Sequence, residues 1–202
     1  MLRITIHPLL LIVLLMMIFT GNIALYSIIL CSLIVHEVGH LLAAKAVNLQ
    51  LKSCVIMPYG GEIKLRQEGT YLQRLIIALG GPCATLIGMA SCAFLPPLLG
   101  APFFKVQFYL LCLNLLPFLP LDGGKIICYA LLTIFPKAKI YEVFLSLSLG
   151  FFSIIAIVAF LLLPQSIPIL LLSILLWINL IGEWKYRKYR IAYEKIVLNR
   201  LT

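Results

Sequence analysis

Two histidines and a glutamate lie within an apolar run that is long enough to cross a lipid bilayer. The run extends from Ile23 to Ala46, and its second half contains His36-Glu37-Val38-Gly39-His40. Ionisable groups inside a lipid-embedded helix are costly and are functional by default. Because residues four apart share one face of a helix, His36 and His40 can reach the same point beside it. The chain must therefore fold so that a polar site is enclosed within a membrane.

The composition independently predicts a membrane protein. Of the 202 residues 63% are hydrophobic and only 11% are charged, which is more apolar surface than a water-soluble core of this size can hide. A spanning helix needs about 20 apolar residues. We therefore predict an all-α polytopic membrane protein with six transmembrane helices, at Ile4–Phe19, Ile23–Ala46, Leu75–Leu95, Val106–Phe135, Val143–Leu163 and Ile167–Ile181.

The first of these runs has a second interpretation. Arg3 precedes it, as in a signal peptide, but no small-x-small cleavage site follows, so we expect a retained helix. We assign residues 1–182 to a single six-span membrane domain. Residues 183–202 then form a basic interfacial tail on the cytoplasmic side.

Basic residues predict the orientation in the membrane. Six spans place both termini on one side, and the tail is rich in Lys and Arg, so this side should be the cytoplasm. Lys105 is the one basic residue in a loop assigned to the outside. The net charge of +9 then indicates orientation and attraction to anionic lipid. Without a soluble domain to carry this charge, we expect no nucleic-acid partner.

The spacing of the histidines is typical of a zinc site. In a His-Glu-x-x-His helix the histidines bind the metal and the glutamate acts as general base, which assigns His36 and His40 as ligands and Glu37 as the base. Catalytic zinc usually has a third protein ligand. Asp122 is the one further acid at membrane depth, in a run interrupted by prolines and glycines, as expected where backbone lines a cavity. Asp122 could instead cap a helix that begins at Gly123.

The loop after the second run has a strand pattern. Between Leu51 and Arg66, apolar residues flank a Gly-containing turn, so we predict a short β-hairpin between the second and third helices. Gly60, Gly61, Glu62 and Ile63 would then bind substrate by adding an extended peptide to the second strand. An ordinary connecting hairpin is the alternative.

Small residues recur along the third run. Gly80, Gly81, Ala84 and Gly88 follow spacings of three and four, which suits close approach to another helix. We expect the interrupted fourth run to be that helix.

Two motifs together carry a family resemblance. His36-Glu37-x-x-His40 in one run and Asn114-x-x-Pro117-x-x-Pro120-Leu121-Asp122-Gly123-Gly124 in a later one resemble the site-2 protease family of intramembrane zinc metalloproteases. The resemblance implies one zinc ion per chain, held by His36, His40 and Asp122, with Glu37 as catalytic acid and base. It also implies that Asn114 positions the substrate, although this amide could simply join two helices by a hydrogen bond.

The resemblance extends to biology. Within the family the chain is most similar to the sporulation proteases, which implies a membrane-associated pro-sigma factor as substrate, membrane-protein inhibitors as partners, and a location in the mother-cell membrane around the forespore. Those proteases carry a nucleotide-sensing CBS domain after the last span; this chain stops at Thr202, and we expect no CBS domain.

We therefore predict an intramembrane zinc metalloendopeptidase that cleaves a membrane-associated substrate near the cytoplasmic face. The alternative is a metal-ion transporter or metal-binding membrane protein. Such a carrier would not need Glu37 as a base.

Overall fold

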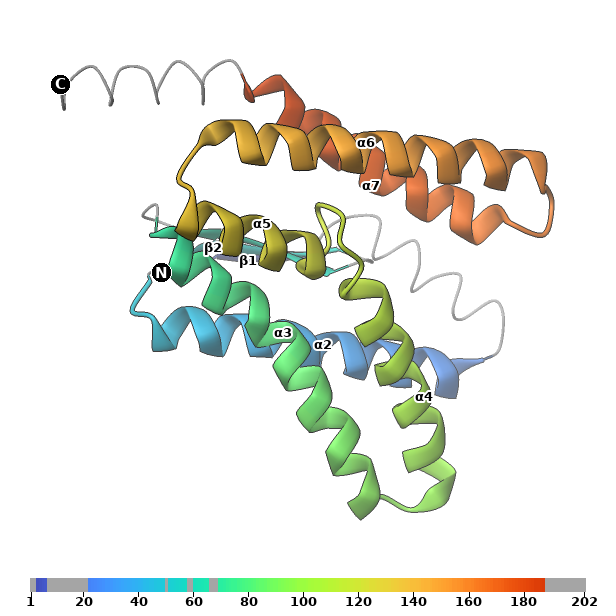
Figure 1. The fold of residues 1–202 in the computed structure, drawn as a ribbon. Helices are drawn as coiled ribbons and strands as arrows, with labels where there is room; N and C mark the ends of the chain where they lie inside the picture. The colour runs from blue at the N-terminus through green and yellow to red at the C-terminus, as the bar shows by residue number, and fades with distance from the viewer. Residues whose placement is uncertain (1–2, 7–21, 50, 58–59, 66–68, 188–202) are drawn as a thin grey trace, which may run out of the picture. The chain divides into compact units, whose positions relative to one another are not determined.

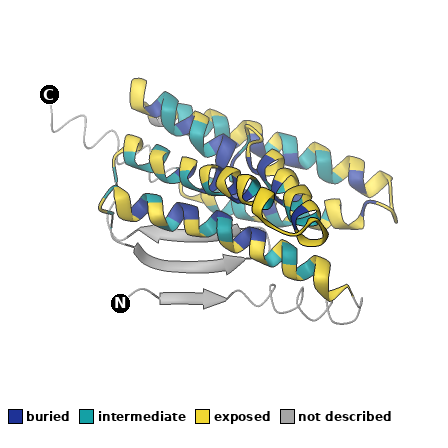
Figure 2. Cartoon of the chain, turned by 90° about the horizontal axis from the view of Figure 1, so that it is seen from below, coloured by how far each residue is buried: buried dark blue, intermediate teal, exposed yellow. Residues whose placement is uncertain are grey.

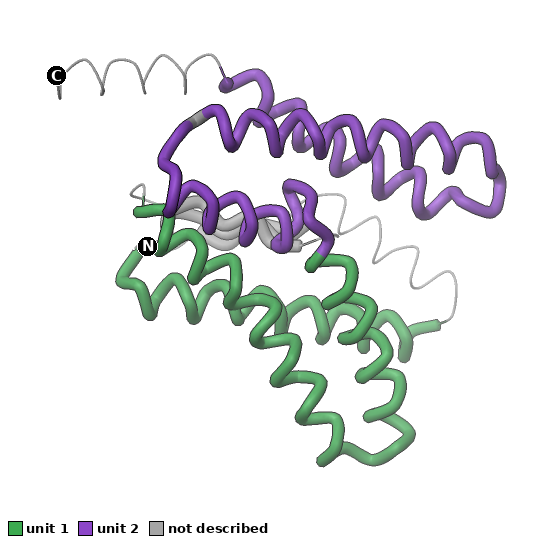
Figure 3. Tube along the Cα trace, viewed as in Figure 1, with its two compact units in different colours: residues 1–115 green, residues 116–202 purple. Residues whose placement is uncertain are grey.

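Helices form most of the described chain. The computed structural model describes residues 3–6, 22–49, 51–57, 60–65 and 69–187 (Figure 1). It divides into two units, Met1–Leu115 and Leu116–Thr202, coloured separately in Figure 3.

Unit 1 contains three long helices that pack side by side. These are α2 (Ile23–Ala46), α3 (Tyr71–Ser91), which continues into the short 3₁₀-helix η1 (Cys92–Phe94), and α4 (Pro97–Asn114). A capping box starts α3: the Thr70 hydroxyl accepts from the Gln73 backbone N–H, and the Gln73 side chain accepts from the Thr70 backbone N–H. Pro97 occupies the first turn of α4, where its missing N–H costs nothing.

Two glycines bring α2 and α3 into backbone contact. A Cβ on Gly39 would lie 2.5 Å from the Ala84 Cβ, and a Cβ on Gly80 would lie 2.7 Å from the Ala43 Cβ. Gly80 and Ala84 therefore pack against α2. For these two residues, the expectation that they would pack against the fourth run was wrong. The reason is that α2 offers its own glycine at the same level, which lets two backbones meet.

A three-stranded sheet completes unit 1. Its order is β1 (Arg3–Ile6), β2 (Leu51–Met57) and β3 (Gly60–Leu65), with β1 parallel and β3 antiparallel to β2, so β3 is an edge strand among the described residues. Strands β2 and β3 occupy the segments predicted for the hairpin, and Ile63 pairs with Cys54. The connection at residues 58–59 lies outside the described residues.

Strand β1 corrects the prediction of a helix that begins at Ile4. The segment from Ile4 to Ile6 instead pairs with the segment from Cys54 to Ile56. Two isoleucines and a threonine, all β-branched, suit a strand, and the pairing partner is distant in sequence. The rest of that predicted span, residues 7–21, lies outside the described residues.

Unit 2 contains α5 (Asp122–Ile134), α6 (Ala138–Leu161) and α7 (Ile167–Lys185). Helices α6 and α7 run antiparallel beside each other (Figure 1), and the indole N–H of Trp177 donates to the Ser153 hydroxyl at 3.0 Å. Exposed residues lie along the helices of both units (Figure 2), and large apolar side chains such as Ile154 and Leu171 are among them. Exposed apolar faces of this extent indicate contact with lipid.

Four described helices are long and apolar enough to cross a membrane, so the prediction of six spans is not confirmed. They are Ile23–Ala46, Tyr71–Phe94, Lys139–Leu161 and Ile167–Lys185. The predicted span Val106–Phe135 is instead two helices, because α4 begins at Pro97 and residues 115–121 separate it from α5. Prolines explain the difference. Pro97 starts α4, and Pro117 and Pro120 interrupt the predicted span before α5.

Candidate metal centre

Helix α2 holds the two predicted histidine ligands side by side. His36 and His40 are both buried, their rings meet edge to face, and their Nε2 atoms lie 3.2 Å apart. One turn of helix separates the two residues, so a regular helix is sufficient to bring these nitrogens together.

Hydrogen bonds from α3 allow the tautomer of His36 to be assigned. Its Nδ1 lies 2.8 Å from the Thr85 hydroxyl oxygen, and that hydroxyl donates to the Gly81 carbonyl at 3.1 Å. With the hydroxyl proton of Thr85 on the Gly81 carbonyl, we assign His36 as the donor in the first bond. Its Nε2 is then unprotonated.

His40 is held in the same way. Its Nδ1 lies 2.8 Å from the carbonyl oxygen of Ile77, which can only accept, so Nδ1 carries the proton. The Gly81 backbone nitrogen also lies 3.2 Å from this Nδ1, but both are donors in that tautomer, so we assign the bond to the carbonyl. Both histidines thus present an Nε2 lone pair to the same point, which is the arrangement of two ligands for one cation.

Gly81 leaves the space in front of these nitrogens open. A Cβ at this position would lie 2.6 Å from His36 Nε2 and closer still to His40 Nε2. No side chain larger than hydrogen fits there without displacing a ring. The residues of unit 1 therefore form a small cradle that opens onto two unprotonated imidazole nitrogens.

Glu37 follows His36 directly in α2. Its Oε2 is buried and has no hydrogen-bond partner among the residues that the structure describes. The Glu37 carboxylate therefore has unused capacity to accept a hydrogen bond.

Unit 2 contains the third predicted ligand, Asp122, as the first residue of α5. The residue is buried, with 4% of its surface exposed, and Lys125 Nζ lies 3.4 Å from its Oδ1. The N-cap of α5 is Leu121, without a side-chain cap bond. The alternative that Asp122 caps a helix starting at Gly123 was therefore wrong, because Asp122 already lies inside the helix.

The broken segment before α5 is tied down within unit 2. The Leu119 N–H donates to the Ser148 hydroxyl at 2.9 Å, and the Phe118 ring stacks on Phe151 of α6 with centroids 3.6 Å apart. A Cβ on Gly124 would run into the Phe118 carbonyl and the Leu119 nitrogen, so glycine is required for this chain reversal. These contacts hold the segment that leads into α5, and so the start of the helix at Asp122, against α6.

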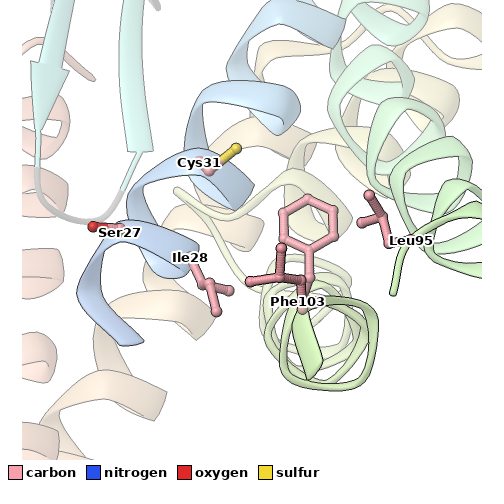
Figure 4. Close-up of a pocket in the computed structure, with 6 residues that line it drawn as sticks. Ser27, Ile28, Cys31, Leu95 and Phe103 are labelled. Carbon is pink, nitrogen blue, oxygen red and sulfur yellow. The ribbon is translucent and has the colours of Figure 1, made fainter. Parts of the chain in front are cut away.

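The remaining predicted site residues lie in other elements of unit 1. Asn114 is buried at the last position of α4, and Gly60, Gly61, Glu62 and Ile63 lie in the edge strand β3. Unit 1 also has a recess of about 260 Å³ (Figure 4), with an almost wholly apolar lining of Ser27, Ile28, Cys31, Leu95, Leu99 and Phe103. Since it contains none of the predicted ligands, it is not the metal centre.

Sequence reasoning missed the partners on α3. Ile77, Gly81 and Thr85 follow a spacing of four and so share one face, which meets both histidines. The small-residue pattern had drawn attention to Gly81 as a packing residue only. Thr85 lies within the same stretch, so a polar residue on the small-residue face was the available signal.

Comparisons with known proteins point to one family. The profile of peptidase family M50 matches residues 24–106, a range that contains the His-Glu-x-x-His motif and α3 but not Asp122. The chain is 25% identical over 198 residues to stage IV sporulation protein FB of Bacillus subtilis (strain 168), covering 93% of this chain and 68% of that protein. A Synechocystis protein with "zinc metalloprotease" in its name is 28% identical over 110 residues, covering 50% of this chain and 29% of that protein.

A solved structure shares the fold. The site-2 protease from Methanocaldococcus jannaschii matches with a TM-score of 0.67 and 20% identity, covering 90% of each chain. The predicted resemblance to the site-2 protease family, peptidase family M50, is therefore confirmed. This is a family of membrane metalloproteases.

Proposed function

We propose that this protein is an intramembrane zinc metalloendopeptidase that cleaves a membrane-associated protein. The observation that carries the proposal is the pair of imidazole Nε2 atoms 3.2 Å apart, each with its Nδ1 proton committed to α3. In these tautomers both Nε2 atoms carry a lone pair, so both can bind the same cation.

Zinc fits this donor set. Imidazole nitrogen suits Zn²⁺, and ligating histidines commonly donate their other ring N–H to an oxygen, as His36 and His40 do. When bound, zinc acts as a Lewis acid that lowers the pKa of a water to about 7 and polarises the scissile carbonyl. We propose one ion per chain.

Asp122 is our third ligand. It is a buried carboxylate whose helix does not use it as a cap, and Lys125 neutralises part of its charge. Ionisable residues inside a membrane mark functional sites, and a carboxylate oxygen is a common zinc ligand. Three protein ligands leave a fourth zinc position for water or substrate.

Glu37 is the acid and base of the reaction. Its unpartnered Oε2 takes the proton of the attacking water and then passes it to the leaving amine of the cleaved bond. The reaction consumes one water for each peptide bond.

The edge strand β3 gives the substrate a docking place. A transmembrane helix hides its carbonyls in its own hydrogen bonds, so it must become extended before cleavage. The segment Gly60–Ile63 can pair with such an extended peptide because β3 ends the sheet, and Asn114 can hold a substrate carbonyl.

The similarity to stage IV sporulation protein FB supports a finer proposal about biology. By this similarity the substrate is a membrane-associated pro-sigma factor, membrane-protein inhibitors are partners, and the site is the mother-cell membrane around the forespore. We further propose that both termini are cytoplasmic, so that cleavage occurs near that face.

The decisive experiment separates metal binding from chemistry. The full chain is co-expressed with a tagged candidate substrate, as wild type, Glu37→Gln and His40→Ala, and zinc is counted in each purified protein. We expect Glu37→Gln to keep its zinc but to lose cleavage by about 10² to 10⁴-fold, since it removes only general-base catalysis. His40→Ala should lose the metal itself. Near-wild-type cleavage by Glu37→Gln would refute the proposal, and metal flux across vesicles with no cleavage would favour a transporter.

A further inference from the structure

We propose that Ser32 and Gln107 form an internal water site one helical turn from His36, which holds water for hydrolysis. The proposal rests on the proposed function, because only a hydrolase consumes water at this centre. It concerns two residues that none of the motifs includes.

Both side chains are fully buried with polar atoms left unsatisfied. Ser32 and Gln107 each have 0% of their surface exposed. Neither Ser32 Oγ nor either amide atom of Gln107, Nε2 or Oε1, has a hydrogen-bond partner among the described residues. An unpaired amide inside a membrane protein is costly, and each unsatisfied buried polar group calls for an explanation.

The Gln107 amide lies between the three helices of unit 1. A Cβ on Gly88 of α3 would lie 2.8 Å from Gln107 Nε2 on α4 and 3.4 Å from Val35 Cγ1 on α2. Gly88 thus provides the space that the amide occupies. Because Val35 precedes His36, the amide lies at the level of the turn of α2 just before the metal ligands.

Ser32 belongs to the same part of α2. It precedes His36 by four residues, so both side chains lie on one face of the helix, about 6 Å apart along its axis. On α3, Gly88 follows Thr85 by three residues, and Thr85 holds His36. The unsatisfied polar atoms are therefore in the layer next to the histidine pair.

Water is the occupant that fits this layer. Full burial within a three-helix core leaves no route for a peptide, whereas buried water typically makes about three hydrogen bonds to otherwise unsatisfied groups. The Gln107 amide supplies donors and an acceptor, and Ser32 supplies one more of each. The recess of Figure 4 does not provide these contacts, because its lining is almost wholly apolar.

Removal of the amide tests the site in the zinc-loaded, full-length protein. The structure of wild type and of Gln107→Leu is determined at a resolution that shows ordered water, and zinc content, KM and kcat are measured for both. We expect an ordered water within hydrogen-bond distance of Gln107 in wild type and none in the variant. We also expect kcat to fall about 10-fold, as is typical when a supporting interaction of a metal site is lost, with zinc content and KM unchanged.

Two further variants make the test independent of one substitution. Gln107→Met serves if the leucine variant does not fold, because methionine is flexible and similar in volume. Ser32→Ala should also lower kcat, whereas Ser173→Ala, at a buried serine of α7 that donates to the Leu170 carbonyl, should leave it unchanged.

The water site would be refuted if wild type showed no ordered water at Gln107 and Gln107→Leu kept the wild-type kcat with a higher melting temperature. The melting temperature would rise because an apolar group then replaces an amide that has no hydrogen-bond partner. Glu37→Gln is measured in parallel. If it is inactive while Gln107→Leu is dry and fully active, only the water site fails. If it is active, the proposed function itself fails.

Discussion

The sharpest test of the metal cradle is the addition of one methyl group at Gly81. In Gly81→Ala the new Cβ would lie 2.6 Å from His36 Nε2, and ordinary contact begins at 3.4 Å. The imidazole would therefore have to retreat by about 0.8 Å, the difference between the two distances. Zinc–ligand distances tolerate about 0.2 Å, so the two nitrogens can no longer share one ion.

The protein itself should remain folded. Alanine is favoured over glycine within a helix by about 1 kcal/mol, and this gain offsets the loss of about one hydrogen bond if a ring rotates away from Thr85 or from the Ile77 carbonyl. We therefore expect little change in melting temperature without metal. Zinc affinity should fall at least about 100-fold, which corresponds to about 2.7 kcal/mol.

The assay titrates zinc against a competing chelator in the purified chain and measures substrate cleavage in parallel. Gly150→Ala is the matched control, because a Cβ at this position of α6 meets nothing within 4 Å. That variant should bind zinc and cleave as wild type does. If Gly81→Ala also kept wild-type zinc affinity and activity, the two Nε2 atoms would not be the metal ligands, and our reasoning would be refuted.

Three further predictions concern the surroundings of the metal. Thr85→Val removes the acceptor for His36 Nδ1 with little change in volume and should weaken zinc binding by about 10 to 100-fold in the chelator titration, whereas Thr85→Ser should not. Asp122→Asn should lower both zinc content and cleavage, because a neutral amide is a poor ligand; full zinc content would exclude Asp122 from the ligand set. Ile63→Pro removes a backbone donor from β3 and should impair cleavage with zinc still bound; unimpaired turnover would make β3 a simple connector.

The helical part of the site followed from local sequence. One turn of helix brings His36 and His40 together in any regular helix, and the predicted run from Ile23 to Ala46 has the same bounds as α2. The interruption before Asp122 was also readable, because proline and glycine act on their own backbone.

Contacts between segments that are distant in sequence could not be predicted in this way. Strand β1 was mistaken for the start of a helix, because Ile4 to Ile6 are as apolar as a spanning segment and their strand partner is β2, far along the chain. The fourth run was predicted to begin at Val106, whereas α4 begins at Pro97. Hydropathy indicates the extent of an apolar run, but a proline decides where the helix begins.

The sequence by itself determined the solvent and the chemistry of this protein: a chain 63% hydrophobic requires a bilayer, and His-Glu-x-x-His within an apolar helix indicates a metal. Only the tertiary structure decided how the histidines are held, through Thr85, the Ile77 carbonyl and the open space at Gly81. The physical reason is the separation along the sequence between the residues that interact. Helix periodicity is set by neighbours within four residues, whereas the protonation and aim of each imidazole depend on which face of α3 meets α2, and that choice is made by glycines that let the two backbones touch.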